Sequence, residues 1–234
     1  MSDQFIFFCV NVGNEKLLKE EVKNFYPELT LSYSRKGFLT FKNLGVLYDL
    51  VTISQLHSTF ATRVGISLGK ASPEDILEKV ISSCDNLEIQ LEKCIIHSFS
   101  INTDYILDAN NIFKKEVNGY SANEKLVYDI ISLSSTEIWF GVHTVAKGIT
   151  RFPNSHVEID VPDNAPSRSY LKLAQLVELY SLKLRRVDSC LDFGSSPGGA
   201  SLYLLSKGCK VWGIDTARMS SVNTAFELMS GTFL

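Results

Sequence analysis

The segment LDFGSSPGGASL, residues 191–202, constrains the fold of this chain more than any other. The β-prone run DSCLDF at 188–193 predicts a short strand before the glycines, and ASLYLLSKG at 200–208 predicts a helix after them. A second β-prone run, KVWGID at 210–215, predicts another strand. Because a helix of this size can cross between strands of one sheet, the two strands are predicted to be parallel neighbours.

The turn between the first strand and the helix has the pattern D-x-G-x-x-P-G-G over residues 192–199. Glycines let a ligand approach the backbone closely, and the start of a helix offers free N–H groups. A dinucleotide fingerprint would have glycine at 194, 196 and 199, but residue 196 is serine, and no Gly-Lys-Ser/Thr of a P-loop follows. Asp215 closes the second strand, where a carboxylate can accept hydrogen bonds from ribose hydroxyls. The pattern therefore favours a nucleoside ligand and does not require a pyrophosphate.

The chain before residue 150 mixes predicted strands and helices. Strands are predicted at 5–12, 29–34, 37–42, 60–69, 94–102 and 137–145, and helices at 13–27, 44–53, 72–84 and near 123–133. This mixture predicts an α+β domain at residues 1–150. A proline-containing stretch predicts a linker at 151–165, and a leucine-rich helix is predicted at 170–184. The fold class expected for the whole chain is α/β.

Composition excludes several classes of protein. The hydrophobic share of 45% and charged share of 21% are those of a folded globular chain, and no apolar run is long enough to span a bilayer. The five cysteines form no C-x-x-C pair, which favours reduced thiols and a cytoplasmic location. The four histidines lie far apart in the sequence, so we expect no metal. The N-terminus lacks the basic region and cleavage site of a signal peptide, so no leader is expected.

The net charge of −3 is unevenly distributed. Residues 1–164 carry 15 lysines and arginines against 21 acids, whereas residues 165–234 carry 8 against 5. The second segment is therefore the better candidate to face the phosphates of a nucleic acid. The alternative is that a charge asymmetry of this size arose by chance.

The glycine turn together with Asp215 resembles motif I and its acidic partner in the class I S-adenosylmethionine-dependent methyltransferases. The D-x-G-x-x-P-G-G form is similar to that of the FtsJ-type ribose 2′-O-methyltransferases, and APSRSYLKL at 165–173 resembles the segment that those enzymes place before motif I. EIWFGVHTVAKGITRFP at 137–153 and DVPDNAPSRSYLKL at 160–173 are similar to a family that modifies 23S ribosomal RNA and carries an N-terminal THUMP-like RNA-binding domain.

The resemblance implies a cofactor, a partner and a set of site residues. The cofactor is S-adenosyl-L-methionine and the partner is ribosomal RNA, with no membrane and no metal. Residues 1–150 correspond to the THUMP-like domain, and residues 166–234 to the N-terminal part of a Rossmann-like methyltransferase domain. Lys172 corresponds to a catalytic lysine and Arg168 to an RNA contact. The cofactor-binding residues implied by the resemblance are Asp192, Gly194, Ser195, Ser196, Pro197, Gly198, Gly199 and Asp215.

FtsJ-type enzymes use a Lys-Asp-Lys-Glu tetrad, of which only the first lysine is matched here, by Lys172. The other three positions follow the second strand in the family order and are assigned to no residue. The expectation is therefore a truncated form of a longer enzyme, inactive by itself. The full-length enzyme is expected to be a monomer, whereas this chain is expected to self-associate through residues 188–234, where apolar strand residues lack cover.

Two other functions remain open from the sequence. The chain can be a non-catalytic RNA-binding or docking module, which a natural C-terminus at Leu234 would favour. It can also be part of a nucleotide-dependent oxidoreductase, against which Ser196 and the Pro-Gly-Gly form argue. Binding of S-adenosylmethionine rather than NAD separates the methyltransferase from the oxidoreductase.

Overall fold

The computed structural model describes residues 3–114, 117–118, 126–145, 152–153 and 157–218. The chain is a mixed α/β protein and divides into two compact units, Met1–His156 and Val157–Leu234. None of the described helices has the length and hydropathy that crossing a bilayer requires.

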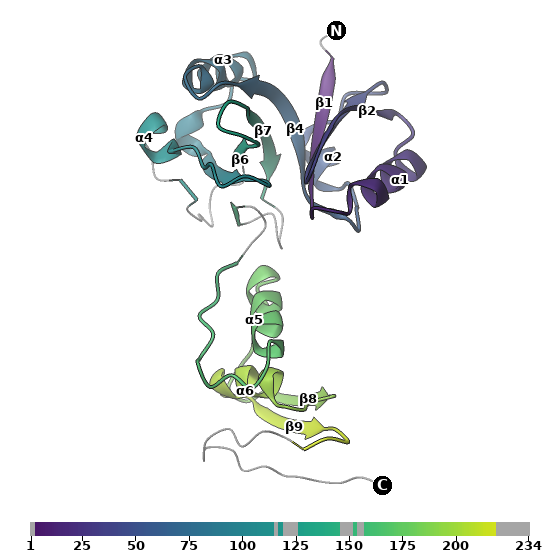
Figure 1. Ribbon diagram of the computed structural model, residues 1–234, viewed down its shortest axis with the longest axis vertical. Helices are drawn as coiled ribbons and strands as arrows, with labels where there is room; N and C mark the ends of the chain where they lie inside the picture. The colour runs from purple at the N-terminus through teal and green to yellow at the C-terminus, as the bar shows by residue number, and fades with distance from the viewer. Residues whose placement is uncertain (1–2, 115–116, 119–125, 146–151, 154–156, 219–234) are drawn as a thin grey trace. The chain divides into compact units, whose positions relative to one another are not determined.

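The first unit contains a seven-stranded sheet with the order β2-β3-β1-β4-β7-β6-β5 (Figure 1). Its strands are β1 (Gln4–Val10), β2 (Leu29–Arg35), β3 (Phe38–Asn43), β4 (Ala61–Ala71), β5 (Ile95–Ser100), β6 (Leu126–Ser132) and β7 (Ile138–Thr144). Its helices are α1 (Glu15–Phe25), α2 (Leu50–Ser54), α3 (Ile76–Asn86) and α4 (Ala109–Phe113), with a 3₁₀ turn at Leu91–Lys93. Within this sheet, all described strand pairs are antiparallel except β5 with β6, which are parallel.

Strand β1 is buried on both faces, which explains why its sequence is a continuous apolar run. Successive side chains of a strand point to opposite faces of the sheet. Ile6 and Phe8 pack with residues of α1 and α2, whereas Phe7 and Cys9 belong to a second cluster with Trp139 of β7. Apolar residues are therefore needed at every position, as is usual for a strand covered on both sides.

The predicted helix near 123–133 is wrong over its described residues, because Leu126–Ser132 is the strand β6. This strand pairs with β5 on one side and β7 on the other, and Val127–Ser132 are all buried. Tertiary pairing therefore overrides the helical spacing of the apolar residues. The helix predicted at 44–53 is also shorter than expected, since α2 begins only at Leu50.

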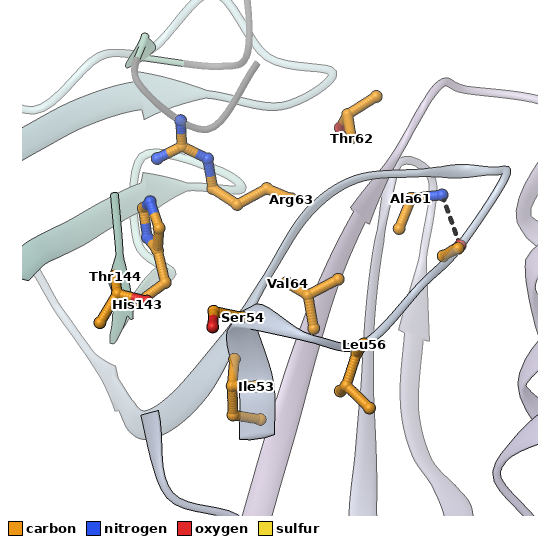
Figure 2. A pocket seen from close by; sticks show the side chains of 10 residues that line it. Ile53, Ser54, Leu56, Ala61, Thr62, Arg63, Val64, His143 and Thr144 are labelled. Atoms are coloured by element: carbon orange, nitrogen blue, oxygen red, sulfur yellow. Dashed lines mark hydrogen bonds between the residues drawn. The ribbon is translucent and has the colours of Figure 1, made fainter. Parts of the chain in front are cut away.

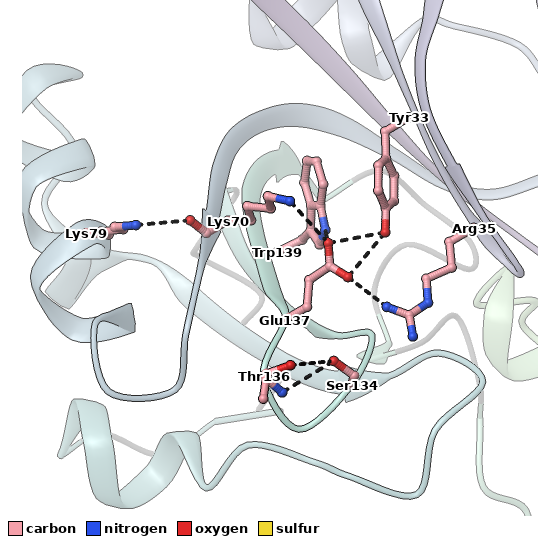
Figure 3. A network of polar contacts seen from close by, with 8 residues as sticks. All are labelled: Tyr33, Arg35, Lys70, Lys79, Ser134, Thr136, Glu137 and Trp139. Carbon is pink, nitrogen blue, oxygen red and sulfur yellow. Dashed lines mark hydrogen bonds and ion pairs between the residues drawn. The ribbon is translucent and has the colours of Figure 1, made fainter.

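A carboxylate at the start of β7 connects distant strands of the sheet (Figure 3). Glu137 accepts hydrogen bonds from the hydroxyl of Tyr33 at 3.2 Å, from Arg35 Nη1 at 2.7 Å and from Trp139 Nε1 at 3.1 Å. The ammonium of Lys70 lies 3.5 Å from the same carboxylate and 5.7 Å from the centre of the Trp139 ring. Although partial burial raises its pKa, these hydrogen bonds and cations lower the pKa of Glu137 overall, so its charge is stabilised.

The second unit has the predicted strand, helix and strand. It consists of α5 (Ser169–Leu179), β8 (Ser189–Phe193), α6 (Gly199–Ser206) and β9 (Lys210–Ile214). The strands β8 and β9 are parallel, with Asp192 opposite Gly213, which confirms the parallel pairing predicted from the sequence. Helices α5 and α6 pack through Tyr170 and Tyr203, whose rings meet edge to face with centroids 5.3 Å apart.

The face of the two-stranded sheet that carries Leu191, Phe193, Trp212 and Ile214 is exposed among the described residues. Phe193 is the most exposed of them, with 73% of its surface accessible. These residues alternate with Asp192 and Cys190 on β8, so the opposite face is the one that packs beneath α6.

Part of the predicted linker packs within the second unit. Val157 is buried, and Gln175 of α5 donates a hydrogen bond to its carbonyl oxygen at 3.4 Å. Ile159 and Ala165 contact the apolar cluster between α5 and α6. Residues 151 and 154–156 of the predicted linker lie outside the described residues.

Candidate cofactor site

The glycine turn leaves β8 through a backbone conformation that favours glycine. Gly194 has φ of +74°, and its N–H donates to the carbonyl oxygen of Ile214 at the end of β9, at 2.8 Å. A Cβ added at Gly194 would meet no atom of the described residues within 4 Å, so this side of the turn is open within the described part of the chain. Gly198, with φ of +111°, ends the turn, and α6 begins at Gly199. The first amides of α6 have no carbonyl four residues earlier in the helix and are available as donors.

Asp215 joins the glycine turn to the loop that follows β9. Its carboxylate accepts a hydrogen bond from the Ser196 amide at 2.8 Å and one from the Ala217 amide at 2.7 Å. These bonds, that from Ala217 first, lower the pKa of Asp215 and stabilise its charge. The Ser196 hydroxyl donates to the Arg218 carbonyl oxygen at 2.9 Å. Ser196, which breaks the dinucleotide fingerprint, therefore connects the glycine turn to the loop after β9 through two hydrogen bonds, one to Asp215 and one to Arg218.

Asp192 lies on the face of β8 that packs beneath α6. The hydroxyl of Ser201 donates to Asp192 Oδ2 at 2.6 Å, and Ser201 is only 2% exposed. Asp192 thus lies near the carboxyl end of β8, and Asp215 directly follows the carboxyl end of the neighbouring parallel strand β9. Crevices at this edge of a parallel sheet are the usual ligand sites of α/β proteins.

The segment before α5 contacts the start of α6. A Cβ at Gly199 would lie 2.4 Å from Ser167 Oγ and 2.5 Å from Ser169 Oγ, so no side chain fits there without displacing the backbone or these hydroxyls. The two hydroxyls lie 2.6 Å apart. The structure therefore brings the Ser-Arg-Ser segment and the Pro-Gly-Gly turn together, although about thirty residues separate them in the sequence.

The remaining predicted residues divide between the turn and the surface. Ser195 is buried and Pro197 is half-buried within the turn. Lys172 and Arg168 are exposed, and Lys172 lies on the side of α5 away from the buried residue Tyr170. Among the described contacts, neither Lys172 nor Arg168 touches Asp192 or Asp215. Sequence reasoning missed Ser167, Ser169 and Ser201; the only signal was their place beside the motif.

The first unit holds a second polar cluster that the sequence did not reveal. Arg63 of β4, His97 of β5, Asp129 of β6 and His143 of β7 are all buried on one face of the sheet. Arg63 donates to Asp129, to His97 Nδ1 at 3.0 Å and to the carbonyl oxygen of Phe152, while Asp129 also binds His143. The two histidines, far apart in the sequence, have ring centroids 6.3 Å apart.

The electrostatics of this cluster follow from its burial. Burial first, and then the charge of Arg63, lower the pKa of His97 to about 3, so its imidazole is neutral and Nδ1 accepts from Arg63. Burial raises the pKa of Asp129, but Arg63 and His143 outweigh it and bring this pKa to about 2. A pocket of about 110 Å³ lies beside the cluster (Figure 2). It is lined by Ile53, Ser54, Leu56, Ser58, Ala61, Thr62, Arg63, Val64, His143 and Thr144. Among the described residues, no three His, Cys, Asp or Glu side chains are grouped so as to hold a metal ion.

Comparison with known proteins finds sequence relatives of the second unit. Residues 165–231 match the FtsJ-like methyltransferase family. Ribosomal RNA large subunit methyltransferase M of Laribacter hongkongensis (strain HLHK9) is 35% identical over 74 residues, which cover 29% of this chain and 21% of that protein. The match thus spans about a fifth of the length of this relative.

Two solved structures are similar over most of the chain. A possible methylase from Clostridium difficile 630 is 14% identical with a TM-score of 0.42, over 88% of this chain and 56% of its own. TrmN from Thermus thermophilus is 16% identical with a TM-score of 0.38, over 90% of this chain and 64% of its own. The resemblance read from the glycine turn is confirmed by sequence: residues 165–231 match the FtsJ-like methyltransferase family.

Proposed function

We propose that this chain is the N-terminal part of an S-adenosyl-L-methionine-dependent methyltransferase that modifies a ribose 2′-hydroxyl of 23S ribosomal RNA. The observation that carries the proposal is the bond between Asp215 and the Ser196 amide, because it places an ionised carboxylate beside the open side of the turn. The match to the FtsJ-like family over the same residues supports this assignment.

The chemistry of the cofactor fits the groups at this edge of the sheet. The cofactor would supply a methyl group on a sulfonium, together with a ribose, an adenine and an α-amino acid. Asp215 offers free lone pairs to the ribose hydroxyls, and the turn at Gly194 gives backbone close to the ligand. Asp192 offers its second carboxylate oxygen. Ser195, Pro197, Gly198 and Gly199 shape the turn between these two acids.

Methyl transfer to a hydroxyl would form the new O–C bond as the bond between the methyl carbon and the sulfonium sulfur breaks, which leaves S-adenosylhomocysteine. It also requires a base that accepts the proton of the hydroxyl. We assign this role to Lys172, on its match to the first lysine of the FtsJ-type tetrad. Arg168, exposed at the start of α5, would contact a phosphate of the RNA. The excess of basic over acidic residues in 165–234 supports an RNA-facing role for this segment.

The protein is organised as two domains joined by a linker. Residues 1–150 form a THUMP-like RNA-binding domain, residues 151–165 a linker, and residues 166–234 the start of the methyltransferase domain. The two compact units, divided after His156, support this organisation. The full-length enzyme is a cytoplasmic monomer, and the exposed face around Phe193 supports self-association of this chain.

Ligand binding tests the proposed cofactor. Isothermal titration of the full-length enzyme with S-adenosylhomocysteine, the demethylated product, should give a saturable signal, and titration with NAD should give none. This chain should bind S-adenosylhomocysteine weakly or not detectably, because it contains only the start of the methyltransferase domain. The stronger test of the substrate is transfer of a labelled methyl group by the full-length enzyme to undermethylated 23S ribosomal RNA. Label on a base rather than on a ribose would refute the 2′-hydroxyl assignment, and tight binding of NAD would refute the cofactor.

A further inference from the structure

Ser201 and Asp192 form a hydrogen-bonded pair inside the candidate cofactor site. Ser201 lies in the first turn of α6, is 2% exposed and donates its hydroxyl to Asp192 Oδ2 at 2.6 Å. A serine hydroxyl has a single proton, so this bond uses its whole donor capacity. The pair connects the strand and the helix that flank the glycine turn.

The bond fixes the orientation of the carboxylate. A carboxylate has two oxygens and accepts on both. With Oδ2 held by a buried donor on α6, rotation about the terminal side-chain torsion of Asp192 is restricted, and Oδ1 has one preferred direction. Asp192 is half-buried, so part of its surface remains accessible.

The two carboxylates of the site differ in their surroundings, which indicates different partners. Asp215 is exposed and accepts from two backbone amides, that of Ser196 in the glycine turn and that of Ala217 in the loop after β9. Asp192 accepts from a buried side chain of α6. A half-buried carboxylate binds a cationic donor more strongly than a neutral hydroxyl, because a charged hydrogen bond gains more in a low dielectric. In an adenosyl amino acid, the cationic hydrogen-bond donor at the amino-acid end is the α-ammonium group.

We propose that Ser201 is a positioning residue that orients Asp192 toward the α-ammonium group of the cofactor's methionine moiety. This inference rests on the proposed function, since it requires an adenosyl amino acid in the crevice. Ser201 itself touches Asp192 and not the ligand, so its effect depends on whether the ligand carries the ammonium group.

Two ligands separate this role from a general structural one. S-adenosylhomocysteine carries ribose, adenine and the amino acid, whereas 5′-methylthioadenosine lacks the amino acid. Ser201→Ala should weaken binding of S-adenosylhomocysteine about tenfold, as expected for loss of a bond that supports a charged contact, and leave binding of 5′-methylthioadenosine unchanged. Asp192→Asn should show the same selectivity, and the double variant should be no weaker than Asp192→Asn alone.

The matched control is Ser206→Ala on the same helix. Its hydroxyl donates to the Tyr203 carbonyl oxygen at 2.7 Å at the other end of α6, so its removal should leave both affinities unchanged. If Ser201→Ala unfolds the second unit, Ser201→Cys, which keeps the size but donates weakly, should show the selective loss.

The binding results distinguish failure of the proposed function from failure of the positioning role of Ser201. If neither this chain nor the full-length enzyme binds the two ligands, the proposed function fails, and the role of Ser201 fails with it. If the unaltered chain binds both and Ser201→Ala weakens both equally, the proposed function stands and Ser201 is a structural residue. Unchanged affinity of Ser201→Ala for both ligands also overturns the inference.

Discussion

Arg63 and Asp129 form a fully buried ion pair across strand β7, since Arg63 lies on β4, Asp129 lies on β6, and the sheet order places β7 between them. His143 of β7 binds the second oxygen of the same carboxylate. The other arm of the guanidinium binds the carbonyl oxygen of Phe152. The Arg63 guanidinium and the Asp129 carboxylate together therefore connect β4, β6 and β7 with the chain segment that contains Phe152.

Removal of one partner of this pair should strongly destabilise the first unit. Asp129→Asn leaves Arg63 charged in a site with no exposed surface, and breaking a buried pair costs about 3–5 kcal/mol. Urea denaturation should show this loss. The surface pair of Lys42 with Asp3, at 2.7 Å, is the control, and Asp3→Asn should cost less than about 1 kcal/mol. Similar losses in the two variants would contradict the structural role of the buried pair.

His97 should make stability fall in mild acid. Its folded pKa is about 3, below the ordinary value of 6.5, so the unfolded chain takes up a proton first as the pH falls. The stabilisation is complete above pH 6.5 and is lost progressively between pH 6.5 and 3. His97→Gln, whose amide oxygen can still accept from Arg63, should flatten this dependence. Equal slopes of unfolding free energy against pH for both proteins would refute the assignment.

Asp215 should contribute to binding of every adenosine ligand, in contrast to Ser201. Asp215→Ala removes the acceptor of two amide hydrogen bonds and the proposed partner of the ribose hydroxyls. We expect affinity for S-adenosylhomocysteine and for 5′-methylthioadenosine to fall together by about tenfold. Calorimetry on both ligands checks this, and retention of either affinity would exclude Asp215 from the ribose site.

The two glycines of the turn should respond differently to a methyl group. Gly199→Ala would place its Cβ against Ser167 and Ser169, and overpacking of this kind costs about 1–3 kcal/mol. The methyl group of Gly194→Ala would meet no described atom within 4 Å, so its smaller cost, about 1 kcal/mol, comes from the positive φ. Thermal unfolding should rank Gly199→Ala as the less stable. The opposite order would mean that Ser167 and Ser169 do not pack against the turn.

The sequence by itself determined the local elements of the second unit. The glycines and proline of 192–199 favour a turn, the flanking runs favour a strand and a helix, and these preferences act over a few residues. The parallel pairing of β8 and β9 follows because the connection between them is a helix. Asp215 at the end of β9 was found for the same reason, since its place depends only on where that strand ends.

Only the tertiary structure decided which distant residues meet. Leu126–Ser132 became a strand because β5 and β7 pair with it. Its buried Asp129 is stable there because Arg63 neutralises the carboxylate and His143 is hydrogen-bonded to it. The contact of Ser167 with Gly199, and the bond of Ser201 to Asp192, depend on how α5 and α6 pack. Local preferences carry no information on such pairs, because burial and charge neutralisation are properties of the assembled fold.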